Sequence, residues 1–449
     1  MIANSPESLV RDVLSRVEQD RVSFINLQFT DLVGNVKSVT IPVEQFADCI
    51  EHGKWFDGSS VEGFARIAES DMYLKPDLST FAVIPWEKGA NVTARVICWV
   101  FTPKGELFEG DPRAVLARAL DEAASLGYRY NIGPEVEFFL FKAGDGLVPV
   151  PNDQGGYFDL TTDTAEGIRK EMVEALHAMG IQVEASHHEV ASGQHEVDLK
   201  YDDALRTADN TVTFKYTLKA IAQPHGLYAT FMPKPIYGLD GSGMHTHQSL
   251  AKMKDGQNAF ADPLDEYGLS PVAKHFIAGQ LYHARGMSAI ICPLVNSYKR
   301  LVPGHEAPVY ISWARINRSA LIRVPQVSPS RPEATRIELR SPDPSCNPYL
   351  AFAVMLKCGL DGIKKKLPLP EPVEENLYAF DSTELRRRDI GLLPSTLAEA
   401  LDELRRDEVV QEALGALLTA RYLEAKTMEW QDYRKHVSTW ELEHYLRVF

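Results

Sequence analysis

The chain has 449 residues, of which 45% are hydrophobic and 24% are charged, and its formal net charge is −15 at pH 7. This length allows roughly two to three domains, and the composition is that of a soluble globular protein with a sizeable core. The negative charge excludes a general surface for nucleic acid or acidic membranes, so phosphate binding depends on local arginine clusters. Five scattered cysteines without a Cys-x-x-Cys pair indicate reduced thiols. Because the sequence has no long apolar run and no basic N-terminal signal, we expect a cytoplasmic location.

The N-terminal part of the chain is expected to form a small sheet domain. A short helix near residues 5–17 precedes two β-like segments, 23–29 and 36–41, which flank a Gly-Asn turn region. The polar segment 52–75 is expected to lack regular structure, and its length suggests a functional loop.

The rest of the chain is expected to form a large α/β domain in which strands alternate with capped helices. Asp111-Pro112, Ser270-Pro271 and Asn347-Pro348 each supply an N-cap followed by a first-turn proline, which is typical of a helix start. A further helix from about residue 163 to Gly180 carries an apolar stripe, and the C-terminal part is mostly amphipathic helix. We predict two domains, residues 1–105 and 106–449.

Two carboxylates lie within Gly133–Phe141, a run otherwise suited to a buried strand. Because strand side chains alternate faces, Glu135 and Glu137 point the same way, about 7 Å apart, and repel each other unless a positive group lies between them. Magnesium or manganese would suit such oxygen ligands, but a second acidic segment is needed to complete the site. The alternative is that one or both glutamates lie on a solvated strand face.

Three later segments carry further candidate ligands. In 187–196, Glu189 and Glu196 bracket a glycine that permits a sharp turn, so they could meet the first pair. The glycine-rich segment 240–247 allows close backbone approach to a ligand and places two imidazoles on one strand face. In 336–340, one carboxylate lies between two guanidiniums. Each segment alone also fits an ordinary role, as packed histidines or as an ion-paired strand.

These four segments, in this order and spacing, resemble class I glutamine synthetase of the alpha type over nearly the whole chain. Supporting motifs are Phe56–Ser60 with Glu69–Asp71, Lys234-Pro235 through His245 and Ser249, 296–304, and 317–319. The resemblance implies an α+β fold with a small β-grasp-like N-terminal domain and a large α/β catalytic domain, whose antiparallel sheet forms the active-site funnel. It also implies ATP-dependent ligation of ammonia to glutamate through γ-glutamyl phosphate, in a homo-dodecamer of two stacked hexameric rings with active sites between subunits.

The same resemblance implies roles for individual residues. One magnesium or manganese ion is expected at Glu137, Glu189 and Glu196, and another at Glu135, His245 and Glu338. The expected ATP contacts are Glu184, Tyr201, His247, Ser249, Arg318, Arg323 and Arg336, and the expected glutamate contacts are Asp240, Gly241, Arg300, Glu306 and Arg340.

Catalysis and control are also implied by family positions. Asp57, Tyr157 and Glu189 match the ammonium site, with Asp57 reaching into a neighbouring subunit and acting as the base. Arg318 would neutralise the moving phosphoryl group, and Glu306 matches a flap glutamate that keeps water away. Arg66 matches an arginine that takes part in feedback inhibition by glutamine, whereas Tyr378 lacks the proline-containing surroundings of a nucleotidylated tyrosine.

Three departures from the family pattern are visible. Asp240 stands where asparagine is usual, and His305 stands where tyrosine is usual. An apparent insertion of two residues between Arg323 and Arg336 leaves open whether Arg331 is a nucleotide contact.

Two alternative functions compete with this assignment. A ligase of the same fold could join glutamate to a polyamine or another amine, but Asp57, Tyr157 and Glu306 form an ammonium-sized site. A catalytically silent homologue could serve as a binding protein, but it would have no reason to keep six metal ligands that repel one another without metal.

Overall fold

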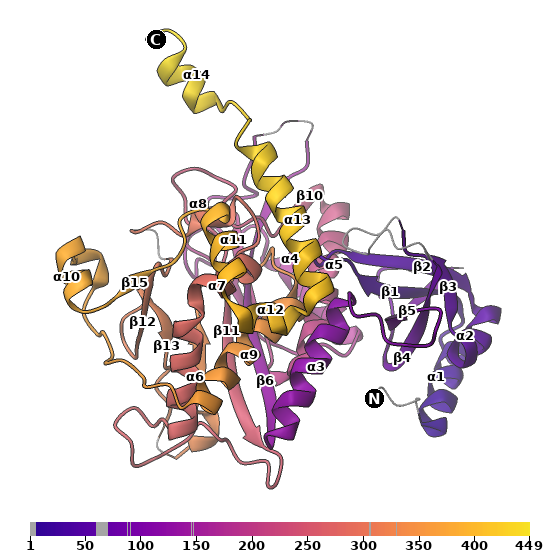
Figure 1. The fold of residues 1–449 in the computed structure, drawn as a ribbon. Helices are drawn as coiled ribbons and strands as arrows, with labels where there is room; N and C mark the ends of the chain where they lie inside the picture. Colours follow the sequence, from indigo (N-terminus) through magenta and orange to yellow (C-terminus); the bar gives the residue numbers. More distant parts are fainter. Residues whose placement is uncertain are drawn as a thin grey trace.

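The chain folds around two β-sheets, which lie side by side in the computed structural model (Figure 1). The structure describes residues 6–59, 71–87, 89, 91–144, 146, 148–304, 307–328 and 330–449. All five cysteines are buried and free, as expected for reduced thiols. Over the ranges just given, helices that could cross a membrane are absent.

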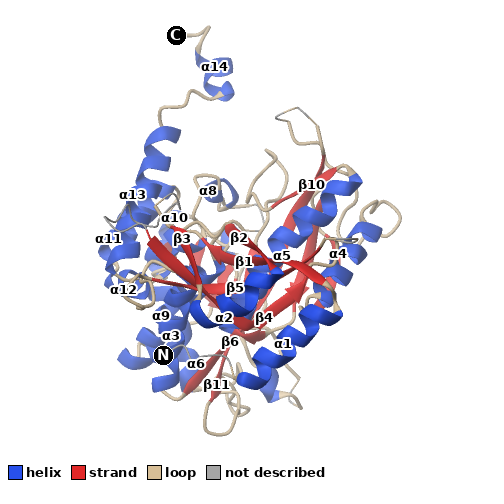
Figure 2. Ribbon diagram, turned by 90° about the vertical axis from the view of Figure 1, so that its right-hand side faces the viewer, coloured by secondary structure: helices blue, strands red, loops and turns tan. Residues whose placement is uncertain are grey.

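The smaller sheet forms the N-terminal domain, with the strand order β2-β1-β5-β4-β3. Its strands are β1 (Val22–Thr30), β2 (Val36–Pro42), β3 (Lys54–Asp57), β4 (Asp71–Val83) and β5 (Val92–Phe101). Strands β1 and β5 pair in parallel, and the other neighbours are antiparallel. Helices α1 (Glu7–Gln19) and α2 (Phe46–His52) share an apolar core with this sheet, which faces the viewer in Figure 2. The predicted small sheet domain is confirmed.

The prediction that residues 52–75 lack regular structure is wrong at both ends. Strand β3 occupies Lys54–Asp57 and β4 begins at Asp71, while residues 60–70 lie outside the described part of the chain. Trp55 of β3 is opposite Tyr73 of β4, with ring centroids 5.2 Å apart. Pairing with a distant strand therefore stabilises a segment that is too short to show a clear alternating pattern.

The larger sheet has the order β15-β12-β13-β14-β11-β6-β8-β7, with β9 and β10 also paired to β6. Its strands are β6 (Tyr128–Lys142), β7 (Val183–His188), β8 (Gln194–Leu199), β9 (Asp202–Asp203), β10 (Leu227–Thr230), β11 (Met244–Lys252), β12 (Tyr310–Ala314), β13 (Ala320–Arg323), β14 (Ile337–Leu339) and β15 (Gly391–Leu392). Only β12 and β13 pair in parallel among these strands. The predicted antiparallel sheet of the second domain is confirmed.

Strand β6 shows how the two faces of this sheet differ. Val136, Phe138 and Leu140 join the main hydrophobic core, where the rings of Phe138 and Phe214 are 6.3 Å apart. Glu135 and Glu137 lie on the opposite face because strand side chains alternate. One face is therefore packed by helices, and the other presents carboxylates.

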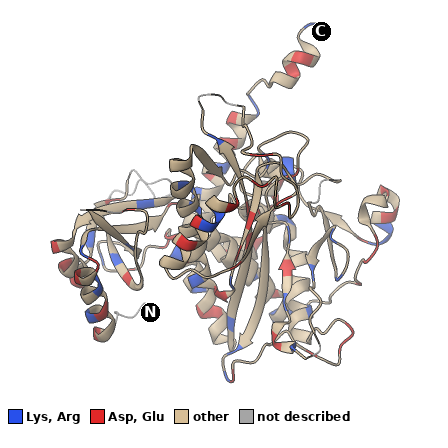
Figure 3. Cartoon of the chain, turned by 180° about the vertical axis from the view of Figure 1, so that it is seen from behind, with Lys and Arg blue, Asp and Glu red and all other residues tan. Residues whose placement is uncertain are grey.

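Several helices of the second domain pack on the larger sheet, and further helices continue to the C-terminus (Figure 1). They are α3 (Pro112–Ser125), α4 (Glu166–Ala178), α5 (Ala204–Ala222), α6 (Pro271–Tyr282), α7 (Ala284–Ile291), α8 (Ser297–Arg300), α9 (Pro348–Lys365), α10 (Ser382–Arg387), α11 (Leu397–Arg406), α12 (Glu408–Leu414), α13 (Ala416–Tyr433) and α14 (Thr439–Tyr445). Seen from behind, the ribbons of α1 and α10 contain both acidic and basic residues (Figure 3). Helix α14 projects away from the body of the protein and carries exposed Trp440 and Tyr445.

The predicted helix starts are confirmed by their caps. The side chain of Asp111 accepts from the backbone N–H of Arg113 at 3.0 Å, and Asn347 accepts from Tyr349 at 3.1 Å. Ser270 likewise accepts from the N–H of Ala273 at 3.2 Å. Each cap satisfies a backbone donor that has no partner within its helix.

Helices α6 and α9 cross at unusually short range because of three glycines. A Cβ on Gly279 would lie 2.2 Å from the carbonyl oxygen of Cys358, and one on Gly362 would lie 2.1 Å from that of His275. A Cβ on Gly359 would lie 2.2 Å from the ring of Phe276. Only hydrogen fits at these positions, so the helices pack backbone to backbone behind the sheet.

Arg113 of α3 links the smaller sheet to helices α5 and α9 through a buried ion-pair network, called here the Arg113 network. Its Nη2 atom lies 2.7 Å from a carboxylate oxygen of Asp77 and 2.8 Å from one of Asp209. The guanidinium carbon lies 3.9 Å from the ring centroid of Trp99, and the Tyr349 hydroxyl donates to Asp209 at 2.6 Å. The network joins residues on both sides of the predicted domain boundary between residues 105 and 106. The exact position of that boundary stays a prediction.

Candidate active site

The four segments that carry the candidate ligands meet on the open face of the larger sheet. Strand register places Glu137 opposite Glu196, Glu135 opposite His245, and Glu338 opposite His247. Side chains far apart in the sequence thus become neighbours through cross-strand pairing.

Glu135, His245 and Glu338, called here the His245 cluster, have the geometry of a metal site. One ligand atom from each lies within 4.8 Å of the others. Burial and the nearby Arg340 lower the pKa of His245 to about 4, which leaves its imidazole in the neutral form that binds metals. Two carboxylates and an imidazole are a donor set that suits manganese or magnesium, so these residues fit such an ion.

The ionised carboxylates of this cluster are already stabilised by neighbouring donor groups. Burial opposes ionisation of Glu338, but Arg340, whose Nη1 donates to it at 2.6 Å, and Arg323, which also donates to it, lower its pKa. Burial also opposes ionisation of Glu135, but hydrogen bonds from His245 and His247 lower its pKa. The cluster is therefore charged and ordered by the protein itself.

His247 orients Glu135 and also lines the cavity described below. Nε of Arg336 donates to Nδ1 of His247 at 3.2 Å, so the ring hydrogen is on Nε2, which lies 2.7 Å from Oε1 of Glu135. The chain from Arg336 through His247 to Glu135 fixes one tautomer and one carboxylate orientation.

Glu137, Glu189 and Glu196, called here the Glu196 cluster, carry mutually repelling carboxylates. Gly193, with φ of +70°, turns the chain between β7 and β8 so that Glu189 and Glu196 lie on either side of His187. Burial and Glu189 raise the pKa of Glu137 to about 8, and burial and Glu137 raise that of Glu196 to about 11. Because buried carboxylates crowd together here, the residues fit a bound divalent cation.

Sequence interpretation missed two residues beside the Glu196 cluster. The Nε2 atom of His187 lies 3.2 Å from Oε1 of Glu196, and ligand atoms of His187, Glu196 and Asp198 lie within 4.8 Å of one another. Asp198 is opposite Glu135 on β6. The alternation in His195-Glu196-Val197-Asp198 places both carboxylates on one face, and this pattern could have revealed Asp198.

A cavity of about 360 Å³ lies beside the His245 cluster. Its lining includes five predicted ATP contacts together with Arg331, namely Glu184, Tyr201, His247, Ser249, Arg336 and Arg331. The two other predicted ATP contacts lie elsewhere: Arg323 pairs with Glu338, and the exposed Arg318 is near enough to Tyr157 to influence its pKa. The predicted ATP contacts are therefore divided between this cavity, the carboxylate of Glu338 and the surroundings of Tyr157.

Arg300, a predicted glutamate contact, is held by main-chain carbonyls. Its Nη1 donates to the oxygen of Ser341 at 2.8 Å and its Nη2 to that of Arg340 at 3.1 Å. A Cβ on Gly241 would lie 2.3 Å from the carbonyl oxygen of Pro233 and 3.2 Å from Cγ of Arg300. Glycine is thus required where the loop containing half-buried Asp240 wraps around Arg300.

The structure brings together two of the three predicted ammonium residues. Tyr157 and Glu189 both lie beside His187, whose ring centroid is 5.5 Å from that of Tyr157 and whose Nδ1 is 3.7 Å from Oε1 of Glu189. Asp57 instead lies on β3 of the other domain, where its exposed carboxylate accepts from the N–H of Ser59 at 2.8 Å (Figure 1). Glu306, Arg66 and His305 lie outside the described residues.

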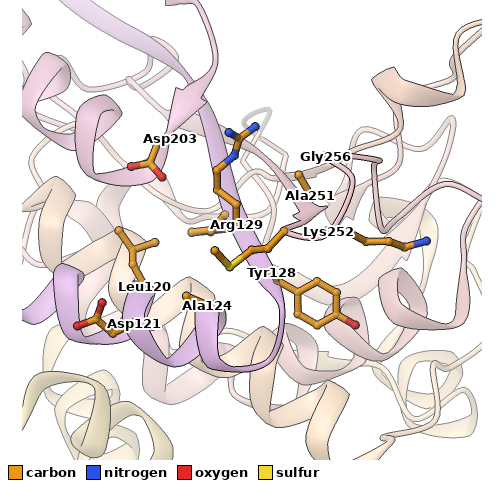
Figure 4. Close-up of a pocket in the computed structure, with 11 residues that line it drawn as sticks. Leu120, Asp121, Ala124, Tyr128, Arg129, Asp203, Ala251, Lys252 and Gly256 are labelled. Carbon is orange, nitrogen blue, oxygen red and sulfur yellow. The ribbon is translucent and has the colours of Figure 1, made fainter.

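A second hollow, of about 400 Å³, lies at the start of β6 and contains none of the predicted site residues (Figure 4). Side chains from α3, β6 and β11 surround it, including Leu120, Arg129 and Lys252. It is separate from the carboxylate face.

A β-grasp domain joined to an antiparallel sheet with two candidate metal-binding clusters and an adjacent cavity is the architecture of a metal-dependent enzyme. The models of the glutamine synthetase β-grasp domain and of the glutamine synthetase catalytic domain match residues 21–103 and 109–445. The chain belongs to the glutamine synthetase family, a family of ATP- and metal-dependent ligases, and the resemblance noted in the sequence is confirmed.

Similar proteins span nearly the whole chain. Glutamine synthetases of Thermus thermophilus and Clostridium saccharobutylicum are 53% and 51% identical to it, each over 98% of this chain, with 99% and 98% of the relatives covered. A solved Plasmodium falciparum glutamine synthetase has a TM-score of 0.88 at 26% identity, covering 99% of each chain. A GmaS structure in complex with ADP has a TM-score of 0.87 at 33% identity, covering 97% of this chain and 99% of that one. The predicted α+β fold is confirmed.

Proposed function

We propose that this enzyme joins ammonia to L-glutamate with ATP, giving L-glutamine, ADP and phosphate. The observation that carries the proposal is the placement of the Glu196 and His245 clusters on one sheet face, beside a cavity lined by predicted ATP contacts. A γ-carboxylate oxygen of glutamate attacks the γ-phosphorus of ATP, and ADP leaves. Ammonia then attacks the γ-carbonyl carbon, and phosphate leaves.

The residues of this chain would serve the reaction in distinct ways. Magnesium or manganese, held by the Glu196 and His245 clusters, would neutralise charge on the transferred phosphoryl group. Arg300 and Arg340 would hold the glutamate carboxylates, and Arg318 would offset charge on the phosphoryl group. Within the described residues, Nε of Arg340 is buried without a hydrogen-bond partner, which supports its proposed role as a donor to substrate.

The ammonium site would be formed by residues of two subunits. Tyr157 and Glu189 would hold ammonium, Asp57 of a neighbouring subunit would accept its proton, and Glu306 would close over the intermediate. Strand β3, which carries Asp57, belongs to the N-terminal sheet and lies away from β6 and β11 of the larger sheet (Figure 1), which supports this sharing.

We propose the same dodecamer of two stacked rings for the assembly. The projecting C-terminal segment carries an apolar surface that a partner could bury, with Trp440 55%, Leu446 70% and Phe449 100% exposed. Mixing two inactive variants, Asp57→Ala and Glu338→Ala, should restore part of the activity in hybrid rings. Co-assembled rings without activity would contradict shared sites.

Substrate choice provides the test of the reaction itself. Phosphate release and product formation should be measured with ATP, glutamate and either ammonium, ethanolamine, putrescine or spermidine, in magnesium and in manganese. We expect glutamine from ammonium and little turnover with the other amines. Turnover with an amine but not with ammonium would instead identify a γ-glutamyl-amine ligase.

We also propose that Arg66 mediates feedback inhibition by glutamine and that the enzyme works in the cytoplasm. Arg66→Ala should keep glutamine synthesis while losing inhibition, and unchanged inhibition would contradict the role. Tyr378 is not expected to be nucleotidylated. Its hydroxyl donates to the carbonyl oxygen of Ala307 at 3.2 Å, which supports a packing role, and an adenylyl mass on this peptide would contradict it.

A further inference from the structure

His188 connects two chain segments behind the predicted ammonium pocket. The residue is buried, its Nε2 lies 3.0 Å from Oδ1 of Asp153, and its Nδ1 lies 2.6 Å from the carbonyl oxygen of Glu189. Its own carbonyl oxygen accepts from the N–H of Phe158 at 3.2 Å. One residue is thus hydrogen bonded to the segment that carries Glu189 and to the segment that carries Tyr157.

Asp153 extends this connection to the turn between β7 and β8. Its Oδ1 also accepts from the N–H of Gly193 at 3.1 Å and from that of Gly155 at 3.3 Å. Its Oδ2 accepts from the N–H of Thr164 at 3.1 Å. Because the carboxylate is buried and holds three backbone donors, it gives His188 a fixed partner.

Close packing makes the position of the His188 ring matter for Tyr157. A Cβ on Gly155 would lie 2.7 Å from Nε2 of His188, so the backbone of this loop lies directly against the ring. Phe158 has φ of +60°, a conformation that non-glycine residues rarely adopt and that needs support from its surroundings. Its ring stacks on Tyr157 with centroids 3.9 Å apart, so the same turn places Tyr157.

A metal-binding role for this region fits less well. Ligand atoms of Asp153, His188 and His195 lie within 4.8 Å of one another. However, Nη1 of Arg169 lies 3.0 Å from Nδ1 of His195, and a guanidinium next to the imidazoles disfavours a second cation. Both ring nitrogens of His188 also face oxygen acceptors, on Asp153 and Glu189. Asp153, His188 and His195 therefore fit a structural role better than a metal site.

We infer that His188 is a positioning residue that holds Tyr157 and Glu189 together as one ammonium pocket. The inference rests on the proposed function, since it assigns a support to that site. His188 acts through the carbonyl of Glu189 and the backbone of Phe158, whereas the residues that line the nucleotide cavity do not include it. Losing His188 should therefore weaken ammonium binding more than ATP or glutamate binding.

The test compares three KM values in two variants with those of the unmodified enzyme. His188→Gln should raise the KM for ammonium by at least about tenfold, while the KM for ATP and for glutamate each change by less than about threefold. Asp153→Asn, which removes the charge opposite His188 and one acceptor oxygen, should give the same split with a smaller rise. His225→Gln is the matched control, because His225 is exposed and pairs with Glu171 at 2.9 Å outside the site.

Each outcome decides the inference. Equal rises in all three KM values, or an unchanged KM for ammonium in a correctly assembled variant, would overturn it. If His188→Gln failed to assemble, as judged by size-exclusion chromatography, Asp153→Asn would decide alone. An unmodified enzyme that made no glutamine would refute the proposed function and this inference together, whereas normal synthesis with no KM split would refute only the inference.

Discussion

Buried charges are arranged in opposite ways in the Arg113 network and in the Glu196 cluster. In the former, burial disfavours the charge of Arg113, but Asp209 and Asp77 more than offset this and raise its pKa. In the latter, burial and like charges act in the same direction and raise the pKa of Glu137 and Glu196. Opposite charges stabilise the network within the protein, whereas burial and like charges disfavour the ionised form of the carboxyls in the cluster.

The largest expected effect is a conflict between activity and stability at the Glu196 cluster. Glu196→Gln should lower kcat/KM by about 1,000-fold or more, because a predicted metal ligand and its charge are lost. The same change should stabilise the metal-free protein at pH 7, by on the order of 1 kcal/mol or more. Glutamine formation and urea unfolding in EDTA would measure the two effects.

The sign follows from the raised pKa of Glu196. A carboxyl with a folded pKa of about 11, against an ordinary value of 4.5, contributes less stability as the pH rises between these values. Glutamine lacks this titration, so the advantage of the variant should grow with pH. Exposed Glu424→Gln serves as control, and a destabilised Glu196→Gln protein would contradict the comparison.

Arg113→Met should have the opposite effect on stability. Removing the guanidinium leaves the buried carboxylates of Asp209 and Asp77 without their positively charged partner. This loss should lower the free energy of unfolding by about 3–5 kcal/mol. Urea unfolding would measure the loss. The matched control is Arg421→Met, whose arginine pairs with Glu424 at 2.9 Å on the surface and should matter by less than about 1 kcal/mol. Equal losses in the two variants would contradict the distinction.

Metal addition should affect variants of the Arg113 network and of the Glu196 cluster differently. Manganese added to EDTA-treated protein should raise the free energy of unfolding by about 2.7 kcal/mol at 100 times its Kd, since it binds only the folded chain. Thermal unfolding should show this gain in Arg113→Met but a reduced gain in Glu196→Gln. An equal gain in both would show that the Glu196 cluster is not where the stabilising ion binds.

The smallest expected effect concerns His283, a buried imidazole that pairs with two carboxylates outside the candidate active site. Its Nδ1 lies 2.8 Å from Asp407 and its Nε2 lies 3.1 Å from Asp361, which also pairs with Lys365. Burial opposes protonation, but the two carboxylates raise the pKa of His283. Its stabilising contribution is therefore complete below the ordinary value of 6.5 and is lost as the pH rises through the folded pKa.

The stability gap between the unmodified protein and His283→Gln should thus be about 1 kcal/mol larger at pH 6 than at pH 9. Urea unfolding at both values would measure the gap, and the gap of Arg113→Met serves as a reference that should change less. A gap that widens with rising pH would mean that the carboxylates do not favour the charged imidazole.

Local chemistry could be predicted from the sequence, and cross-strand geometry could not. The caps at Asp111, Ser270 and Asn347 depend on neighbours a few residues away, so the sequence predicts them well. Alternation likewise placed Glu135 and Glu137 on one face of β6.

Other features depend on strand register between distant segments. The pairing of Arg323 with Glu338 and the approach of His187 to Glu196 arise only after β13, β14, β7 and β8 align. Strand β3 was missed for the same reason, because β4 supplies its hydrogen bonds. The family resemblance supplied metal ligands that periodicity alone could not distinguish from a solvated strand.

The glycine crossing of α6 and α9 restricts how this sequence can drift over generations. Any substitution at Gly279, Gly359 or Gly362 adds at least a methyl group where other atoms already lie within about 2.2 Å. Every single substitution at these positions should therefore destabilise the protein. At Gly279 and Gly362 the obstructing atoms are backbone carbonyl oxygens, which no substitution on the facing helix removes, whereas at Gly359 the obstructing group is the ring of Phe276. Lineages of this enzyme should therefore diversify along the outer surface of α9 while these three positions stay fixed.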